Sequence, residues 1–169
     1  MSGEVAFGAA ISEDRQHGSI VAAGRERDGS RLVVDLAPFY GHPRLMVGRM
    51  EALYLKHDPV AVAVNPKSQS ATLVKALAEV GIVVLEMSAE DVIVGHAEFL
   101  DLVNDGGLAH LDQEPLTAAV RAAQQRPLSG AQAWDPKVGV DQSPLVAATG
   151  ACWAYLRWEE LATPGVWAV

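Results

Sequence analysis

The sequence contains little cysteine, few aromatic residues and no long apolar run. Its single cysteine, Cys152, lies in an apolar stretch, so a disulfide framework and the cysteine spacings of zinc sites are excluded and a buried thiol is expected. No segment reaches the roughly 18 consecutive apolar residues of a membrane-spanning helix, and no basic-then-apolar start resembles a signal peptide. We therefore expect a soluble protein of a reducing compartment.

Basic residues are also scarce. The chain has 13 Lys and Arg against 21 Asp and Glu, which gives a formal charge of -8. Diffuse binding of phosphates requires a basic surface, so the composition argues against a general nucleic-acid coat. A local basic groove remains compatible with it.

The length and the apolar content fit one domain. With 169 residues, half of them hydrophobic, the chain can bury about 70% of its unfolded surface. We expect this domain to span residues 1–160. Residues 161–169 show no periodicity and are interpreted as a C-terminal tail, either a docking arm or the end of a linker. The dominance of Ala, Val and Leu favours helices packed on a buried sheet, an α/β protein.

The first part of the chain predicts three antiparallel strands. Short apolar runs at residues 5–11, 17–25 and 31–39 are separated by turn residues. Asp28-Gly29 between the second and third runs is typical of a tight hairpin. We predict a three-stranded meander.

The next part alternates helix and strand. Apolar residues recur at helical spacing over 44–57 and 71–80, and continuous apolar runs follow at 60–64 and 82–85. Such alternation predicts two parallel strands joined by right-handed crossovers.

Helices dominate the remainder. Ser88 begins a helix that runs to about residue 104, and a further helix is predicted over 113–125 and is broken at Arg126-Pro127. Residues 131–140 are interpreted as a loop or a short hairpin, and Ser143-Pro144 starts the last long helix. The complete order predicts a ribonuclease H-like mixed sheet of about five strands, three antiparallel and then two parallel, with helices on both faces.

Several segments carry a more specific resemblance. They are residues 7–12, the apolar strand that ends at Asn65, residues 97–102, 107–110 and 118–121, Trp134 and residues 141–147. Together they resemble the nuclease domain of tailed-phage terminase large subunits, over nearly the whole chain. The most specific parts are Asp-x-Ser-Pro-Leu-x-Ala at the start of the last helix and the Leu-x-His step at residues 108–110.

This resemblance implies a DNA endonuclease that cuts concatemeric viral DNA during genome packaging. Its acidic residues would hold two divalent cations, Mg²⁺ or Mn²⁺, which activate a water and stabilise the leaving oxygen. The implied partners are double-stranded DNA, a terminase ATPase domain, the small terminase subunit and the portal, in the cytoplasm of a bacterial host cell. The sequence has no G-x-x-x-x-G-K-[S/T] motif, so we expect the ATPase to lie elsewhere in a longer polypeptide or in a different one.

The resemblance places the three metal-binding positions at Ala10, Asn65 and Asp141. Only Asp141 is an acid: alanine provides no ligand, and the asparagine amide provides one oxygen without charge. We therefore predict a degenerate catalytic site with Asp141 as its remaining metal ligand, weak binding of two ions and little or no cleavage. Natural loss of the acids and inactivation by mutagenesis both explain the substitutions.

Nearby charged residues bear on this site. Four acids are candidate replacements for the lost ligands, but we expect them to be solvated or capping residues: Asp14, Glu86, Glu90 and Asp91. The basic residues expected nearest a DNA groove include Lys67, Arg121 and Arg126. Phosphate contact by residues 65–70, at a helix N-terminus, competes with ordinary capping.

Three functional hypotheses follow. The first is a phage terminase nuclease domain, inactive with the residues present. The second is a non-catalytic DNA-binding or assembly module of the packaging machine. The third is another ribonuclease H-like enzyme, such as a resolvase or transposase core, which Trp134 and residues 141–147 favour less.

Overall fold

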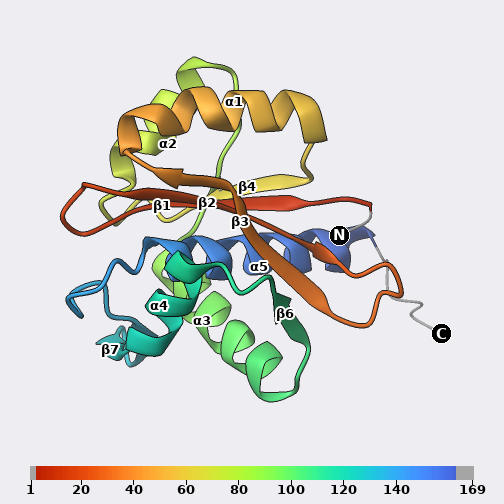
Figure 1. Cartoon of the computed structure of the whole chain (residues 1–169), viewed down its shortest axis with the longest axis vertical. Coiled ribbons are helices and arrows are strands. Elements are labelled where there is room, and N and C mark those ends of the chain that lie inside the picture. Colours follow the sequence, from red (N-terminus) through yellow and green to blue (C-terminus); the bar gives the residue numbers. More distant parts are fainter. Residues whose placement is uncertain (1–2, 163–169) are drawn as a thin grey trace.

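The computed structural model describes residues 3–162, which form a central sheet between two layers of helices (Figure 1). The strands of this sheet are β1 (Ala6–Ile11), β2 (Gly18–Arg25), β3 (Leu32–Gly41), β4 (Ala61–Val64), β5 (Leu85–Glu86) and β6 (Leu108–His110). Their spatial order is β5-β4-β1-β2-β3-β6.

Strand pairing confirms the predicted fold class. β1, β2 and β3 form an antiparallel meander, β4 pairs in parallel with β1, and β5 pairs in parallel with β4. One further strand was not predicted, because Leu108–His110 is too short to show a period. It pairs in parallel with β3 and extends the sheet on that side.

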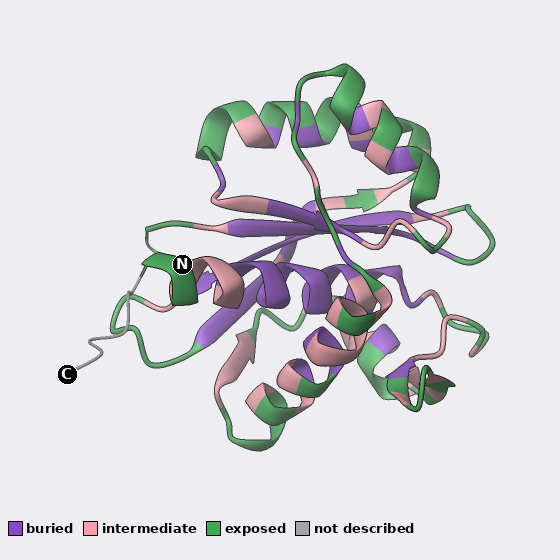
Figure 2. Cartoon of the chain, turned by 180° about the vertical axis from the view of Figure 1, so that it is seen from behind, coloured by how far each residue is buried: buried purple, intermediate pink, exposed green. Residues whose placement is uncertain are grey.

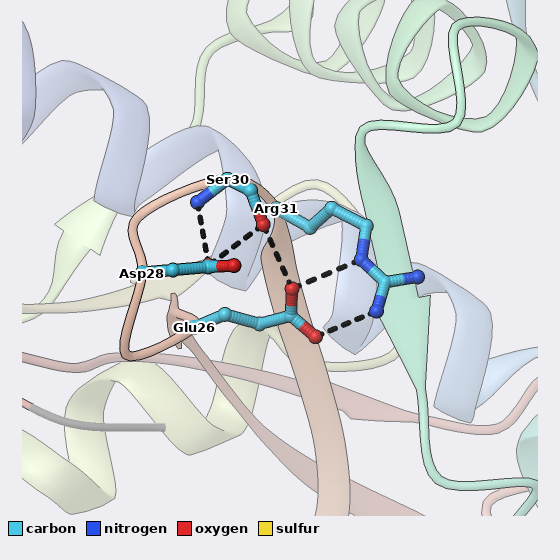
Figure 3. A network of polar contacts seen from close by, with 4 residues as sticks. All are labelled: Glu26, Asp28, Ser30 and Arg31. Carbon is cyan, nitrogen blue, oxygen red and sulfur yellow. Dashed lines mark hydrogen bonds and ion pairs between the residues drawn. The ribbon is translucent and has the colours of Figure 1, made fainter.

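The turn between β2 and β3 is the predicted hairpin. Gly29 has φ +74°, a left-handed conformation that glycine adopts without strain. Asp28 Oδ1 accepts hydrogen bonds from the Ser30 backbone N–H at 3.0 Å and from its hydroxyl at 2.7 Å (Figure 3). Arg31 holds Glu26 with two hydrogen bonds of 3.0 and 2.8 Å across the base of the turn. Local side chains therefore close this hairpin.

The helices divide between the two faces of the sheet. α1 (Met46–His57), which follows a 3-10 turn at Pro43–Leu45, and α2 (Ala71–Glu79) cover one face; α3 (Ala89–Asn104), α4 (Glu114–Ala122) and α5 (Ser143–Ala162) cover the other (Figure 1). β1 contributes to both apolar cores because its side chains alternate. Phe7 belongs to the core beneath α1 and α2, and Ala6 and Ala10 belong to the core beneath α5.

α5 lies close to β1, and Gly8 is the reason. A Cβ atom at Gly8 would lie 2.0 Å from the Ala147 carbonyl oxygen and 2.5 Å from the Ala151 nitrogen. Most of the first three turns of α5 is buried as a result (Figure 2). The missing side chain thus sets the distance between the sheet and its longest helix.

The predicted end of the fourth helix was wrong. α4 ends at Ala122, and a separate hairpin follows, made of β7 (Gln125–Leu128) and β8 (Ala131–Trp134). Its two-residue loop is Ser129-Gly130, and both residues have positive φ, as a type I′ turn requires. Pro127 therefore lies within a strand of a small hairpin rather than at the end of a helix.

Smaller differences concern the second parallel strand and the tail. Ladder pairing in β5 begins only at Leu85, while Ile82 is buried in the core beneath α1 and α2. Of the predicted tail, residues 163–169 lie outside the described part of the chain, and α5 extends through residues 161 and 162. Within residues 3–162, the structure contains no helix with the length and hydropathy needed to cross a membrane.

We expect Gly8→Ala to lower the free energy of unfolding by about 2 kcal/mol or more, because backbone atoms must move to admit the methyl group. Gly48→Ala is the matched control: it lies in α1, and a Cβ there meets nothing within 4 Å. That change should raise the free energy of unfolding by about 0.5–1 kcal/mol. Urea denaturation measures both. Equal stability of Gly8→Ala and the unsubstituted chain would contradict the close approach of α5.

Candidate functional site

The sheet places Ala10 in a row of residues at the carboxyl end of β1. Ala10 pairs with Ser19 of β2, and Ser19 pairs with Tyr40 of β3. On the other side, β4 pairs in parallel with β1 up to Val64, so Asn65 follows in register beside Ala10. Side chains in such cross-strand positions are about 4.5–5.5 Å apart at Cβ, so the row forms one continuous strip.

Two serines connect this row to Asp141. The Ser19 and Ser143 hydroxyls are 2.8 Å apart in a buried environment. Asp141 Oδ1 accepts from the Ser143 backbone N–H at 2.8 Å, and Oδ2 accepts from the Ser143 hydroxyl at 3.1 Å. Because the single Ser143 hydroxyl proton goes to the carboxylate, Ser19 must donate to Ser143. Ala10 is thus linked to Asp141 through its cross-strand neighbour.

Tyr40 also contacts Asp141. Its pKa is raised above the usual value, first by burial, then by the negative charge of Asp141 and by the hydrogen bond that the phenol donates to that carboxylate. The Tyr40 ring stacks on His17, with centroids 5.4 Å apart and planes inclined by 6°. Asp141 therefore already has a backbone N–H and two hydroxyls as hydrogen-bond donors.

Asn65 is engaged in the turn that follows β4. Its Oδ1 accepts from the Lys67 backbone N–H at 2.9 Å, and its backbone carbonyl accepts from the Ser68 hydroxyl at 2.7 Å. This is the hydrogen-bonding pattern by which asparagine stabilises a turn. Its side-chain oxygen, the atom that could bind a cation, thus already accepts one hydrogen bond from the chain itself.

Two neighbouring cavities flank the candidate site. The Asp141 cavity, of about 320 Å³, is lined by Ser12, Glu13, Asp14, Pro136, Lys137, Gly139, Val140 and Asp141. The Trp134 cavity, of about 90 Å³, is lined by Asn65, Lys67, Ser68, Met87, Val92, His96, Arg126, Ala133, Trp134, Pro136, Val146, Thr149 and Gly150. Pro136 lines both cavities. The structure therefore links Ala10 with Asp141 but places Asn65 in the other cavity.

The basic residues expected near DNA differ in whether they line the Trp134 cavity. Lys67 and Arg126 line the Trp134 cavity together, although they come from the β4–α2 turn and from β7. Arg121 is exposed on α4 and is not among the residues that line this cavity. Two of the three predicted DNA-binding residues thus lie together beside Asn65.

The neighbouring acids do not rebuild a metal site. Asp14 lines the Asp141 cavity, but its carboxylate accepts from the Ser12 hydroxyl at 2.6 Å, which lowers its pKa. Asp91 accepts from the backbone N–H and the hydroxyl of Ser88, so it caps α3 as its sequence position suggested. Glu86 is exposed on β5. Each has the solvated or capping role favoured for it.

The arrangement does not fit a two-metal centre. Among the described residues, no group of three or more His, Cys, Asp or Glu side chains is arranged to hold a metal ion. Mg²⁺ needs oxygen ligands in a nearly octahedral shell, and carboxylates usually contribute the charge. Glu13 and Asp14 line the same cavity as Asp141, but the three carboxylates are not arranged as such a group.

Sequence reasoning missed Ser19, Tyr40 and Ser143 as partners of the site. Ser143 was interpreted only as a helix start, and the other two become relevant through strand register. His96 of α3 is a further residue of this region, and its side chain is buried beside Trp134. The spacing of Val92, His96 and the buried Phe99 on one side of α3 was the signal that could have indicated this.

Solved structures of phage terminases share this fold. The HK97 bacteriophage large terminase is 13% identical, with a TM-score of 0.67, over 91% of this chain and 40% of the terminase. The nuclease of thermophilic phage G20c is 15% identical, with a TM-score of 0.64, over 88% of this chain and 80% of the nuclease. The g2p nuclease domain of bacteriophage SPP1, solved with bound Mn, is 15% identical, with a TM-score of 0.57, over 92% and 86%.

The chain therefore has the ribonuclease H-like fold of phage large terminase nuclease domains. It spans about two fifths of the HK97 terminase. The G20c nuclease has also been solved with bound magnesium and with bound cobalt. No protein-family model and no curated protein matches the sequence.

We expect Asp141→Asn to lower the pKa of Tyr40 towards its usual value, because the substitution removes the charge that disfavours tyrosinate. Ultraviolet absorbance of tyrosinate against pH measures this, with Tyr40→Phe identifying the signal. Asp14→Asn is the control, since the Asp14 charge contributes least to the shift. An unchanged Tyr40 titration in Asp141→Asn would show that the two side chains do not meet.

Proposed function

We propose that this chain is a phage terminase-type nuclease domain that engages DNA but has lost the metal centre for cutting it. The observation that carries this proposal is the hydrogen-bond arrangement of Asp141. Its carboxylate is satisfied by Ser143 and Tyr40, in a row where Ala10 supplies no ligand.

Electrostatics supports an inactive centre. A two-metal nuclease relies on several carboxylates to offset the dehydration and mutual repulsion of two divalent cations. Ala10, Asn65 and Asp141 together supply one negative charge, and the Asn65 oxygen accepts from the Lys67 backbone. Mg²⁺ or Mn²⁺, the cations implied for the family, would therefore bind weakly here.

The similarity to phage terminases suggests a ligand, partners and a cellular compartment for this chain. We infer that double-stranded DNA is the ligand, and that a terminase ATPase domain, the small terminase subunit and the portal are partners in the cytoplasm of a bacterial host cell. The alternative is a non-catalytic assembly module of the packaging machine. What favours DNA over a purely structural role is the pair of cations, Lys67 and Arg126, that lines one cavity with Asn65.

The first test restores the lost acids. We expect the unsubstituted chain to leave supercoiled plasmid intact with Mn²⁺, and the double variant Ala10→Asp, Asn65→Asp to nick it. The difference should exceed about 100-fold, since changes to groups that merely support metal ligands already cost about 10- to 100-fold. Agarose electrophoresis of the plasmid measures the outcome.

Two controls accompany this test. Adding Asp141→Asn to the double variant should abolish cleavage, and Ala10→Asn should leave the chain inactive because it adds size without charge. Cleavage by the unsubstituted chain would overturn the inactive centre. A folded double variant that binds DNA but never cuts it would favour the assembly or binding module.

The second test concerns DNA binding. We expect Lys67→Ala and Arg126→Ala each to weaken binding of a short duplex and to reduce the slope of log affinity against log salt by about one. Lys56→Ala, an exposed cation of α1 on the opposite face of the sheet, should change neither quantity. Arg121→Ala should have an intermediate effect, since Arg121 lies outside the cavity. Fluorescence anisotropy over a range of salt measures all four, and equal effects of Lys56 and Lys67 would contradict the assignment.

A further inference from the structure

The Trp134 cavity combines an apolar interior with a charged edge. α3, α5 and β8 contribute its apolar and aromatic lining, including Val92, Trp134 and Val146. Lys67 and Arg126 contribute positive charge to the same cavity. A ligand that fits both parts has an apolar portion and a negative charge beside it.

His96 gives this cavity an unmet hydrogen-bonding requirement. The residue is 4% exposed, and its Nε2 atom has no hydrogen-bond partner in the described part of the chain. Burial lowers its pKa, so the imidazole is neutral at neutral pH. Buried polar atoms are nearly always hydrogen-bonded, so this nitrogen beside a cavity needs a partner, which is either a water or a polar atom of a ligand.

Trp134 is held in place by its own hydrogen bond. Its Nε1–H donates to the Thr149 hydroxyl at 2.9 Å, and that hydroxyl donates to the Leu145 carbonyl at 2.9 Å. The indole N–H is thereby used, so the Trp134 side chain offers a ligand only apolar ring surface. The His96 ring meets the Trp134 ring edge-on, with centroids 4.4 Å apart and planes inclined by 69°.

The volume of the cavity restricts the ligand. About 90 Å³ is several times the roughly 10–15 Å³ that one water needs, and less than the roughly 150 Å³ of an engineered cavity that encloses benzene. A six-membered ring therefore enters with one edge at the opening. A fused two-ring purine would leave more of its surface outside the cavity than a pyrimidine does.

We propose that the Trp134 cavity receives the pyrimidine base of an unpaired nucleotide, with His96 Nε2 hydrogen-bonded to the ring and the neighbouring phosphates at Lys67 and Arg126. The nucleotide is unpaired because a base in a duplex would first have to leave the stack. This proposal rests on the proposed DNA binding and is independent of whether DNA is cut.

Gly150→Ala provides a selective test. Gly150 lines the cavity, and a Cβ there would lie 3.6 Å from Met87 Sδ and 3.8 Å from Ala63 Cβ, both ordinary contacts. The variant should fold at least as well as the unsubstituted chain, because alanine favours a helix. Gly48→Ala in α1 is the matched control, with nothing within 4 Å of the added methyl group.

The experiment compares labelled oligothymidylate and oligodeoxyadenylate of about ten nucleotides by fluorescence anisotropy at fixed salt. We expect the unsubstituted chain and Gly48→Ala to bind oligothymidylate about fivefold more tightly or better. Gly150→Ala should remove most of this preference. His96→Leu should also remove it while leaving the urea midpoint unchanged or higher, because the substitution deletes an unpaired polar atom.

The other outcomes separate the two proposals. Equal binding of both oligonucleotides to the unsubstituted chain, or a preference that survives Gly150→Ala, would overturn the pyrimidine site while duplex binding stands. Competition by inorganic phosphate with no base preference would show a phosphate site and overturn it as well. Failure of every oligonucleotide and of duplex DNA to bind would reject the proposed function too.

Discussion

The packing of α5 against β1 is the contact on which the arrangement of the site depends. Because Gly8 has no side chain, the backbone at Ala147 can approach the strand, where a Cβ would lie 2.0 Å from its carbonyl oxygen. This approach brings the start of α5 to the carboxyl end of β1 and the beginning of β2. The Ser143 hydroxyl then lies 2.8 Å from the Ser19 hydroxyl, and the Ser143 backbone N–H donates a hydrogen bond to Asp141.

Hydrogen bonding explains why the candidate centre is stable without the acids expected from the resemblance. Ser19 donates to Ser143, Ser143 donates to Asp141, and Tyr40 donates to the same carboxylate. Hydroxyl groups thus stabilise the Asp141 carboxylate by hydrogen bonding. The methyl group of Ala10 needs no hydrogen-bond partner. Glu13 and Asp14 line the same cavity as Asp141, but among the described residues no three acidic side chains are arranged to hold a metal ion.

Local patterns predicted the sheet, but they could not predict contacts that depend on register. Short apolar runs and the Asp28-Gly29 turn indicated the meander, and the alternation of helix and strand indicated the parallel pairs. The β7–β8 hairpin was misplaced because Pro127 was interpreted as a helix break and the turn at Ser129 was overlooked. The links from Ser19 and Tyr40 to Asp141 join separate elements, so no local spacing reveals them.

Calorimetric titration of the unsubstituted chain with Mn²⁺ tests the central claim most directly, namely that a terminase nuclease fold here lacks a working metal centre. One carboxylate, already hydrogen-bonded, cannot compensate two divalent cations. The account therefore predicts weak heat changes without a saturable two-ion transition, unaltered by Asp141→Asn. Tight binding of two Mn²⁺ ions that is lost in Asp141→Asn would contradict it.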